Sequence, residues 1–339
     1  MNPLEAFRKR AGSTYPMVLL LLPMVGAIML LVERPQTYTP HPPANDLQIT
    51  LYHRLEAAGL KDDELATTGA LTLGYKEDLN KDLRRHFQAS GAAHVLAVSG
   101  LHTGIIYGLL WWLLTLGGRV RPMHENKAAR RTISMTIIGA MWGYAWLTGM
   151  TPSVVRAVLM VTMVEIGRII YRKSLTVNTI AAAAFLILMV HPTDLWSVSF
   201  QLSFAATTAI VLLLNHTKTT SFFAGIILVS IAAQIGTLPI TMYYFGQVST
   251  YFLLANILVL PLATGLVPCG LMTIALGGSS IGLIMGKATW ALARLMNLSS
   301  EWIESLPGST IPAHINGRMV GVYYLLWAGL YLLIVKKKS

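Results

Sequence analysis

Charged residues are scarce in this sequence. Only 12% of its 339 residues are Asp, Glu, Lys or Arg, whereas 54% are hydrophobic and the mean hydropathy is +0.57. A soluble domain carries about a quarter charged residues, so the deficit excludes a surface that faces water throughout. Cysteine is nearly absent too. Cys269 is the only one, which excludes a disulfide framework and a cysteine metal site.

Acidic residues are also few, and a nucleotide-binding loop is absent from the sequence. The 15 acidic residues leave a net charge of +11, an excess that membrane proteins place at the cytoplasmic face. A Gly-x-x-x-x-Gly-Lys-Ser/Thr loop is absent, because Gly286–Lys287 has Ile281 where the first glycine belongs and is followed by Ala288. Any directed movement would therefore need a motor outside this chain.

Ten apolar segments are present that are each long enough to cross about 30 Å of hydrocarbon. They occupy residues 16–32, 98–117, 133–149, 152–170, 176–191, 195–214, 221–240, 248–268, 270–286 and 320–335. The first follows Arg8, Lys9 and Arg10 and lacks a small-residue cleavage site, which indicates an uncleaved anchor. The sequence predicts an all-α, polytopic membrane helix bundle of about ten transmembrane helices, with broken or re-entrant segments.

The distribution of basic residues orients the bundle. If both termini are cytoplasmic, the inner segments hold 15 of the 26 lysines and arginines, and every short basic loop lies on one side. This requires an even number of spans. We therefore expect a multi-pass protein of the bacterial cytoplasmic (inner) membrane.

Five regions follow from the spans. They are a cytoplasmic tail and anchor helix (1–32), a small outer-face helical segment (33–92), a core of membrane spans (93–286), an outer-face amphipathic helix and loop (287–319), and a last transmembrane helix with a cytoplasmic Lys tail (320–339). The outer segment is expected to hold helices from Asp46 to about Ala58 and from about Leu79 to Gln88. We place the boundary between the eighth and ninth spans at Pro268–Cys269–Gly270.

Several polar side chains interrupt the predicted spans, where an unpartnered polar group is costly. Arg156 could reach outward to the headgroups, or it could line a path for an anion. Glu165 and Arg168, one turn apart, are expected to neutralise each other. The amides could join helices pairwise, or together line a shared polar interior. These further polar residues are Gln201, Ser203, Gln234 and Asn256.

Irregular backbone is expected at three places in the core. In the segment His94–His102, Ser99 lies between two histidines, and Gly100 and Gly104 permit a sharp turn or a close approach. Pro239 and Pro261 mark further expected breaks, of the kind that flank binding sites in transporters.

Four sequence elements in order resemble the membrane domain of the ComEC competence family. The first is His94–Val–Leu–Ala–Val–Ser99–Gly100–Leu–His102, with valine for one leucine of the family pattern, and the third, Phe200–Gln201–Leu–Ser203–Phe204, is intact. The second element comprises Ser153, Arg156, Ala157 and Met160. The fourth comprises Leu238–Pro239, Tyr244–Phe245–Gly246, Asn256 and Pro261.

The resemblance implies a channel for uptake of single-stranded DNA in natural transformation, with these residues along the DNA path. It implies as partners an outer DNA receptor, a cytoplasmic ATPase or helicase and a separate nuclease, besides membrane lipid. Larger family members add an oligonucleotide-binding-type domain and a metallo-β-lactamase-like nuclease domain. Here residues 33–92 are too short for such a barrel, and none of the nine histidines forms a His-x-His pair. We therefore expect a minimal channel or a fragment, without a cofactor, metal site or catalytic residue of its own.

Two other functions remain open at this point. A membrane-embedded serine hydrolase could use Ser99 with His102, His94 or His191. A small-solute (anion) transporter would be supported by inverted repeats, and we find none.

Overall fold

The chain folds almost entirely into helices. The computed structural model describes residues 44–96, 99–115, 127–170, 177–214 and 221–338, with a few residues between 21 and 29. Its helices are α3 (Asp46–Ala57), α4 (Asp62–Thr72), α5 (Lys81–Ser90), α6 (Gly100–Leu114), α7 (Lys127–Leu147), α8 (Pro152–Ile169), α9 (Val177–Val190), the 3₁₀ helix η2 (Pro192–Trp196), α10 (Val198–Leu214), α11 (Phe222–Phe245), α12 (Phe252–Ala275), α13 (Ser280–Ser305) and α14 (Gly317–Lys338). The all-α prediction is confirmed in this coarse form.

Seven of the ten predicted spans coincide closely with a helix. They correspond to α6, α7, α8, α9, α10, α11 and α14. Of the predicted anchor at 16–32, the structure describes residues 21, 23–27 and 29, which are helical. By length and apolar composition, two described helices could cross a membrane, namely Phe223–Phe245 of α11 and Phe252–Ala275 of α12. Three shorter helices, α6, α9 and α10, are also apolar.

The predicted boundary at Pro268–Cys269–Gly270 is wrong. One helix, α12, runs through it to Ala275, and the chain turns only at Gly277–Gly278. The next helix, α13, begins where the Ser279 hydroxyl accepts a hydrogen bond from the Gly282 amide at 3.0 Å, a standard N-terminal cap. This helix continues through residues 286 and 287, where the sequence suggested a change from span to amphipathic helix.

Pro239 and Pro261 do not break their helices, contrary to the prediction. Pro239 lies within α11, and Pro261 and Pro268 lie within α12. A proline has no N–H to donate to the carbonyl four residues earlier. For Pro239 that carbonyl belongs to Ile235, and the Tyr323 hydroxyl of α14 donates to it at 2.9 Å. A neighbouring helix thus replaces the missing hydrogen bond.

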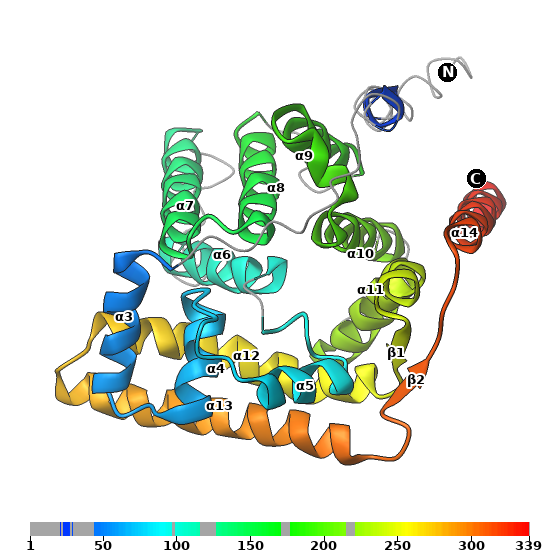
Figure 1. Cartoon of the computed structure of the whole chain (residues 1–339). Coiled ribbons are helices and arrows are strands. Elements are labelled where there is room, and N and C mark those ends of the chain that lie inside the picture. Colours follow the sequence, from blue (N-terminus) through cyan, green and yellow to red (C-terminus); the bar gives the residue numbers. More distant parts are fainter. Residues whose placement is uncertain are drawn as a thin grey trace.

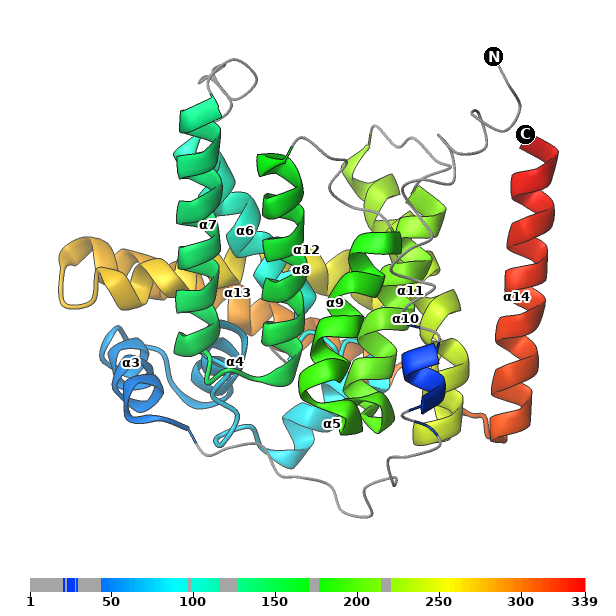
Figure 2. The same ribbon diagram turned by 90° about the horizontal axis from the view of Figure 1, so that it is seen from above.

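The helices form two sets that run in different directions. The antiparallel helices α12 and α13 lie side by side along one edge of the molecule (Figure 1). They run crosswise to α7, α8 and α14 in both views (Figures 1 and 2). The largest core cluster joins α12 to the other set, because it contains Val259 and Leu266 of α12 together with Ile106 of α6, Ile137 of α7 and Val158 of α8.

The predicted outer segment packs on this crosswise pair. Its helices α3 and α5 agree with the expected ranges, whereas α4 lies between them and was not expected. All residues of α4 from Glu64 to Thr72 are buried, in contact with α12 and α13. This helix lacks an amphipathic pattern, since it is covered on all sides and is rich in threonine and alanine, so periodicity could not reveal it.

A short two-stranded sheet joins the start of α12 to the end of α13. Strand β1 (Gln247–Ser249) follows α11 and pairs antiparallel with β2 (Thr310–Pro312), which precedes α14. Gly246 ends α11 with φ of 63°, in the left-handed region that favours glycine. A Cβ at this position would overlap the imidazole of His314. Backbone conformation and space therefore both require glycine here.

We predict that Gly246→Ala destabilises the protein more than Gly308→Ala does. Both glycines have left-handed φ, 63° and 70°, but a Cβ at residue 308 would meet nothing within 4 Å. The control should therefore lose only the backbone preference, about 1 kcal/mol, whereas Gly246→Ala should lose about 2–3 kcal/mol. Thermal unfolding of the purified protein measures both. Equal losses would contradict the role of His314, and His314→Ala should relieve the difference.

Candidate functional site

The described residues 93–96 and Ser99 lie outside the helices, in agreement with the irregular backbone that the sequence predicts. Residues 93–96 form turns and a bend, and Ser99 is the cap of α6. The Ser99 amide donates to His102 Nδ1 at 3.2 Å, and the Leu101 amide donates to Ser99 Oγ at 3.3 Å. Serine and histidine thus form a reciprocal capping box. The short distance of 3.2 Å between Ser99 Oγ and His102 Nδ1 is a consequence of this capping geometry.

His102 carries a further feature that a capping role does not require. Its side chain is fully buried, and Nε2 has no hydrogen-bond partner within the described part of the chain. His94 is exposed, yet lies close enough to act on His102 electrostatically. The segment therefore places two imidazoles near one another.

Gly100 and Gly104 do not form the sharp turn or close approach that the sequence permits. Both lie within α6, and a Cβ at either would meet nothing within 4 Å. Neither a sharp turn nor a close backbone approach occurs at these two positions.

Arg156 is buried rather than directed toward the headgroups. Its side chain is 2% exposed and lies in the second turn of α8, above the first-turn residue Ser153. The Nη2 group donates to the Ser199 carbonyl at 3.0 Å and to Ser199 Oγ at 2.6 Å, which joins α8 to the start of α10. Asp194 of η2 acts on the guanidinium electrostatically. Nε and Nη1 are buried without an acceptor among the described residues.

The Phe200–Phe204 motif lies on the first turns of α10, directly after Ser199. Phe200 is buried and packs on Phe204 with ring centroids 4.4 Å apart. The Gln201 amide donates to the Leu195 carbonyl of η2 at 3.0 Å. Ser203, one turn from Ser199, is half-buried. Arg156 and Gln201 thus brace the same corner, where η2 turns into α10.

Asn256 lies at a different junction. Its amide nitrogen donates to Ser230 Oγ of α11 at 3.0 Å, while its Oδ1 is buried without a donor in the described structure. Gln234, one turn further along α11, is half-buried. The amide of Asn256 therefore joins two helices pairwise.

The aromatic motif ends α11. Tyr244 is half-buried and contacts Tyr243 edge to face at 4.9 Å, and Phe245 is 58% exposed. Pro261 lies in α12, half-buried, one turn and a half beyond Asn256.

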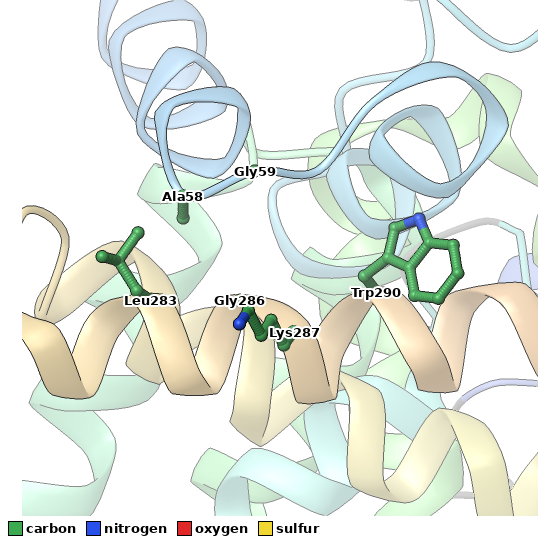
Figure 3. A pocket seen from close by; sticks show the side chains of 6 residues that line it. All are labelled: Ala58, Gly59, Leu283, Gly286, Lys287 and Trp290. Carbon is green, nitrogen blue, oxygen red and sulfur yellow. The ribbon is translucent and has the colours of Figure 1, made fainter.

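The structure brings the motif residues together at three junctions rather than one. These are the cap of α6, the corner of α8, η2 and α10, and the contact of α11 with α12. One hollow of about 340 Å³ borders α10, α11 and α14, and Gln201 is the predicted site residue that lines it. A second hollow of about 420 Å³ lies between Gly59 and α13, beside Lys287 and Trp290 (Figure 3).

The most extensive buried polar cluster was not predicted as a whole. Glu165 of α8 is fully buried and bonded to Arg168 at 3.1 Å, which confirms the expected pair. Its carboxylate also accepts from the Tyr107 hydroxyl of α6 at 2.6 Å and from Ser134 Oγ of α7 at 2.7 Å. The Arg168 guanidinium lies 5.5 Å from the centre of the Trp111 ring. In the sequence, a tyrosine (Tyr107) and a serine (Ser134) within apolar spans were the signals that could have indicated this cluster.

Comparison with known proteins supports one family. The model of the family described as "Competence protein" matches residues 71–338. ComE operon protein 3 of Bacillus subtilis (strain 168) is 29% identical over 73% of this chain and 30% of its own length. The uncharacterized protein YcaI of Escherichia coli (strain K12) is 26% identical over 70% of this chain and 32% of its own. The chain thus spans about a third of the length of these relatives. No solved structure matches the chain significantly.

We predict that Glu165→Gln destabilises the protein far more than Asp82→Asn. Both substitutions neutralise an acid that pairs with an arginine three residues on, but Glu165 is 0% exposed and Asp82 is 76% exposed. Loss of the buried charge should cost about 3 kcal/mol, and loss of the exposed one below about 1 kcal/mol. Thermal unfolding distinguishes them. Similar shifts would show that the buried cluster does not hold α6, α7 and α8 together.

Proposed function

Because the chain belongs to the competence protein family, we propose that it is an inner-membrane channel through which single-stranded DNA enters the cell during natural transformation. The family match and the relative from a ComE operon support a role in DNA uptake. Our proposal goes one step beyond that role, in that the DNA strand passes through this chain itself.

The single observation that carries the channel role is the state of Arg156. A guanidinium is desolvated at depth, and two of its nitrogens lack acceptors among the described residues. A buried charged group left without partners is costly, so this site favours an anion that arrives from elsewhere. A phosphodiester supplies acceptors of the required charge and geometry. The half-buried Tyr244 and the exposed Phe245 offer faces on which bases can stack.

Exposed apolar side chains support the placement in a membrane. Leu325 and Leu326 of α14 are 74% and 70% exposed, and Trp146 of α7 is 62% exposed. Leu325 and Leu326 are neighbours on α14, and monomeric soluble proteins rarely expose large apolar patches. We propose lipid as the solvent of these faces, in the bacterial inner membrane.

The directions of the helices suggest fewer crossings than the ten predicted. If α7, α8 and α14 cross the bilayer, then α12 and α13 run along it (Figure 2). The turn between them lies beside Arg54 of α3, in the segment that charge places outside. Removing the eighth and ninth spans leaves eight. The number remains even, so both termini remain cytoplasmic.

We propose three separate partners for the channel. Transport needs a cytoplasmic ATPase or helicase as the motor, because the sequence has no nucleotide-binding loop of its own. An outer receptor would deliver the strand. A separate nuclease would degrade the complementary strand.

The capping box accounts for the contact between Ser99 and His102, so the geometry does not favour a serine hydrolase. The Ser99 hydroxyl accepts from a backbone amide, and the His102 nitrogen that it faces already accepts from the Ser99 amide. A transporter for small anions would use the same Arg156 site. Uptake measurements with a small anion and with an oligonucleotide distinguish such a transporter from a DNA channel.

We predict that Ser280→Cys, in a Cys269→Ser background, is labelled from the outer face. Ser280 is exposed at the start of α13, and a crosswise pair keeps this turn outside. An impermeant maleimide should label intact spheroplasts. Labelling only after permeabilisation would mean that α12 crosses the membrane.

We predict that Arg156→Ala lowers DNA uptake by about tenfold or more, since a buried cation that contacts a phosphate would be lost. Arg156→Lys should recover only part of the uptake, because one ammonium cannot bind Ser199 as Nη2 does and also offer the two further nitrogens, Nε and Nη1, to a phosphate. Transformation frequency and internalised labelled oligonucleotide are measured at equal protein abundance. Arg131→Ala, on the exposed part of α7, is the control.

Unchanged uptake with Arg156→Ala would reject the transport role of this residue. Where Arg156→Ala lowers abundance, Arg156→Lys at normal abundance decides. Full uptake by that variant would show that charge alone suffices. Reconstituted vesicles that admit a small anion but no oligonucleotide would instead favour the transporter.

A further inference from the structure

Helix α13 has two opposite faces, of which one is accounted for by the fold. Small residues dominate the face that packs on α4, α5 and α12. Its buried residues are Gly282, Gly286, Thr289, Ala293, Met296, Asn297, Ser300 and Ile303. The other face lies at the edge of the molecule (Figure 1).

The outward face carries a regular apolar seam. Its residues alternate at spacings of three and four over three heptads: Ile281, Ile284, Ala288, Ala291, Leu295, Leu298 and Trp302. The large side chains of the seam are between 41% (Leu298) and 62% (Ile284) exposed. This spacing is the pattern by which one helix packs along another.

Three charged residues, each seven residues apart, line one flank of the seam. Arg294, in the middle, is bonded to Glu64 of α4 at 3.2 Å. Lys287 and Glu301 lie at equal distances on either side of it and have opposite charge. Neither has an ion-pair partner among the described residues, whereas the neighbouring Glu304 is engaged by Arg85 and His86 of α5. Two complementary charges are thus left exposed beside an apolar seam.

We propose that α13 pairs with α13 of a second copy of this chain in antiparallel orientation. A two-fold axis near Arg294 places Lys287 of each copy opposite Glu301 of the other. It also brings the two Arg294 side chains together, each of them already paired with Glu64 of its own α4. Flanking charges at these positions determine partner and orientation in paired helices. The inference is independent of what the protein transports.

The same register makes the seam complementary in size. It places Ala288 opposite Leu298 and Ala291 opposite Leu295, so that each alanine meets a leucine. Ile284 lies opposite Trp302. Small residues let two helices approach closely in lipid as in water. Lipid alone would also cover an apolar face, but it does not account for two unpaired charges of opposite sign placed symmetrically about the centre.

Charge reversal tests the pairing. Lys287→Glu and Glu301→Lys should each raise the dimer dissociation constant by about tenfold or more, because each turns two attractions into repulsions. The double variant Lys287→Glu/Glu301→Lys should restore dimerisation. Mass measurement of the full chain in nanodiscs and in detergent, over a range of concentrations, provides the constant. Lys81→Glu, on the exposed face of α5, is the control and should have no effect.

Cross-linking tests the orientation. In a Cys269→Ser background, one tagged copy carries Lys287→Cys and a second, differently tagged copy carries Glu301→Cys. An antiparallel pair should give a cross-link between the two tags, while either variant alone should give little.

Three results would overturn the proposal. The first is a monomer at all concentrations, with lipid covering the seam. The second is efficient cross-linking of Lys287→Cys to itself, which indicates a parallel pair. The third is a double charge swap that fails to restore the dimer, although thermal unfolding shows a folded protein.

Discussion

A polar group buried among apolar helices must find a hydrogen-bond partner within the protein, and this requirement determines where the helices of this chain are joined. Glu165 draws Tyr107 and Ser134 onto one carboxylate, so that α6, α7 and α8 meet at a single point. Pro239 leaves a carbonyl free, and Tyr323 binds it, which docks α14 on α11. In each case the polar group selects the neighbour, and apolar contacts fill the remaining surface.

This selectivity has a consequence for the proposed channel. A polar group that already bonds its neighbour is a poor contact for a moving strand, since transport requires binding that is weak and exchangeable. Asn256 is partly engaged by Ser230 and Gln201 by Leu195, whereas Arg156 retains two free donors in the described structure. The amides therefore fit the role of helix junctions, and the arginine remains the best candidate for contact with a polyanion.

The sequence predicted much of this arrangement where a pattern has one physical cause. Apolar length identified α6 to α11 and α14, and the spacing of Glu165 and Arg168 predicted their ion pair. The turn at Gly277–Gly278 was missed because the sequence placed the boundary at Pro268–Cys269–Gly270. A proline ends a helix only when its freed carbonyl cannot be satisfied elsewhere, and that depends on neighbours that the sequence does not place. The partners of Arg156 and Asn256 were unpredictable for the same reason.

Helix α12 shows why composition does not determine direction. It is as long and apolar as a membrane span, yet it runs beside α13, which carries Lys287, Arg294 and Glu301. Helices α12 and α13 pack along each other, and α4 packs on both of them. Gly286 on the buried face of α13 lets the backbone at Ala58, directly after α3, approach closely. Apolar length measures only how readily a helix leaves water, whereas these packing contacts determine its direction. Because β1 and β2 hold the start of α12 beside the end of α13, this direction also fixes where the outward seam of α13 is presented.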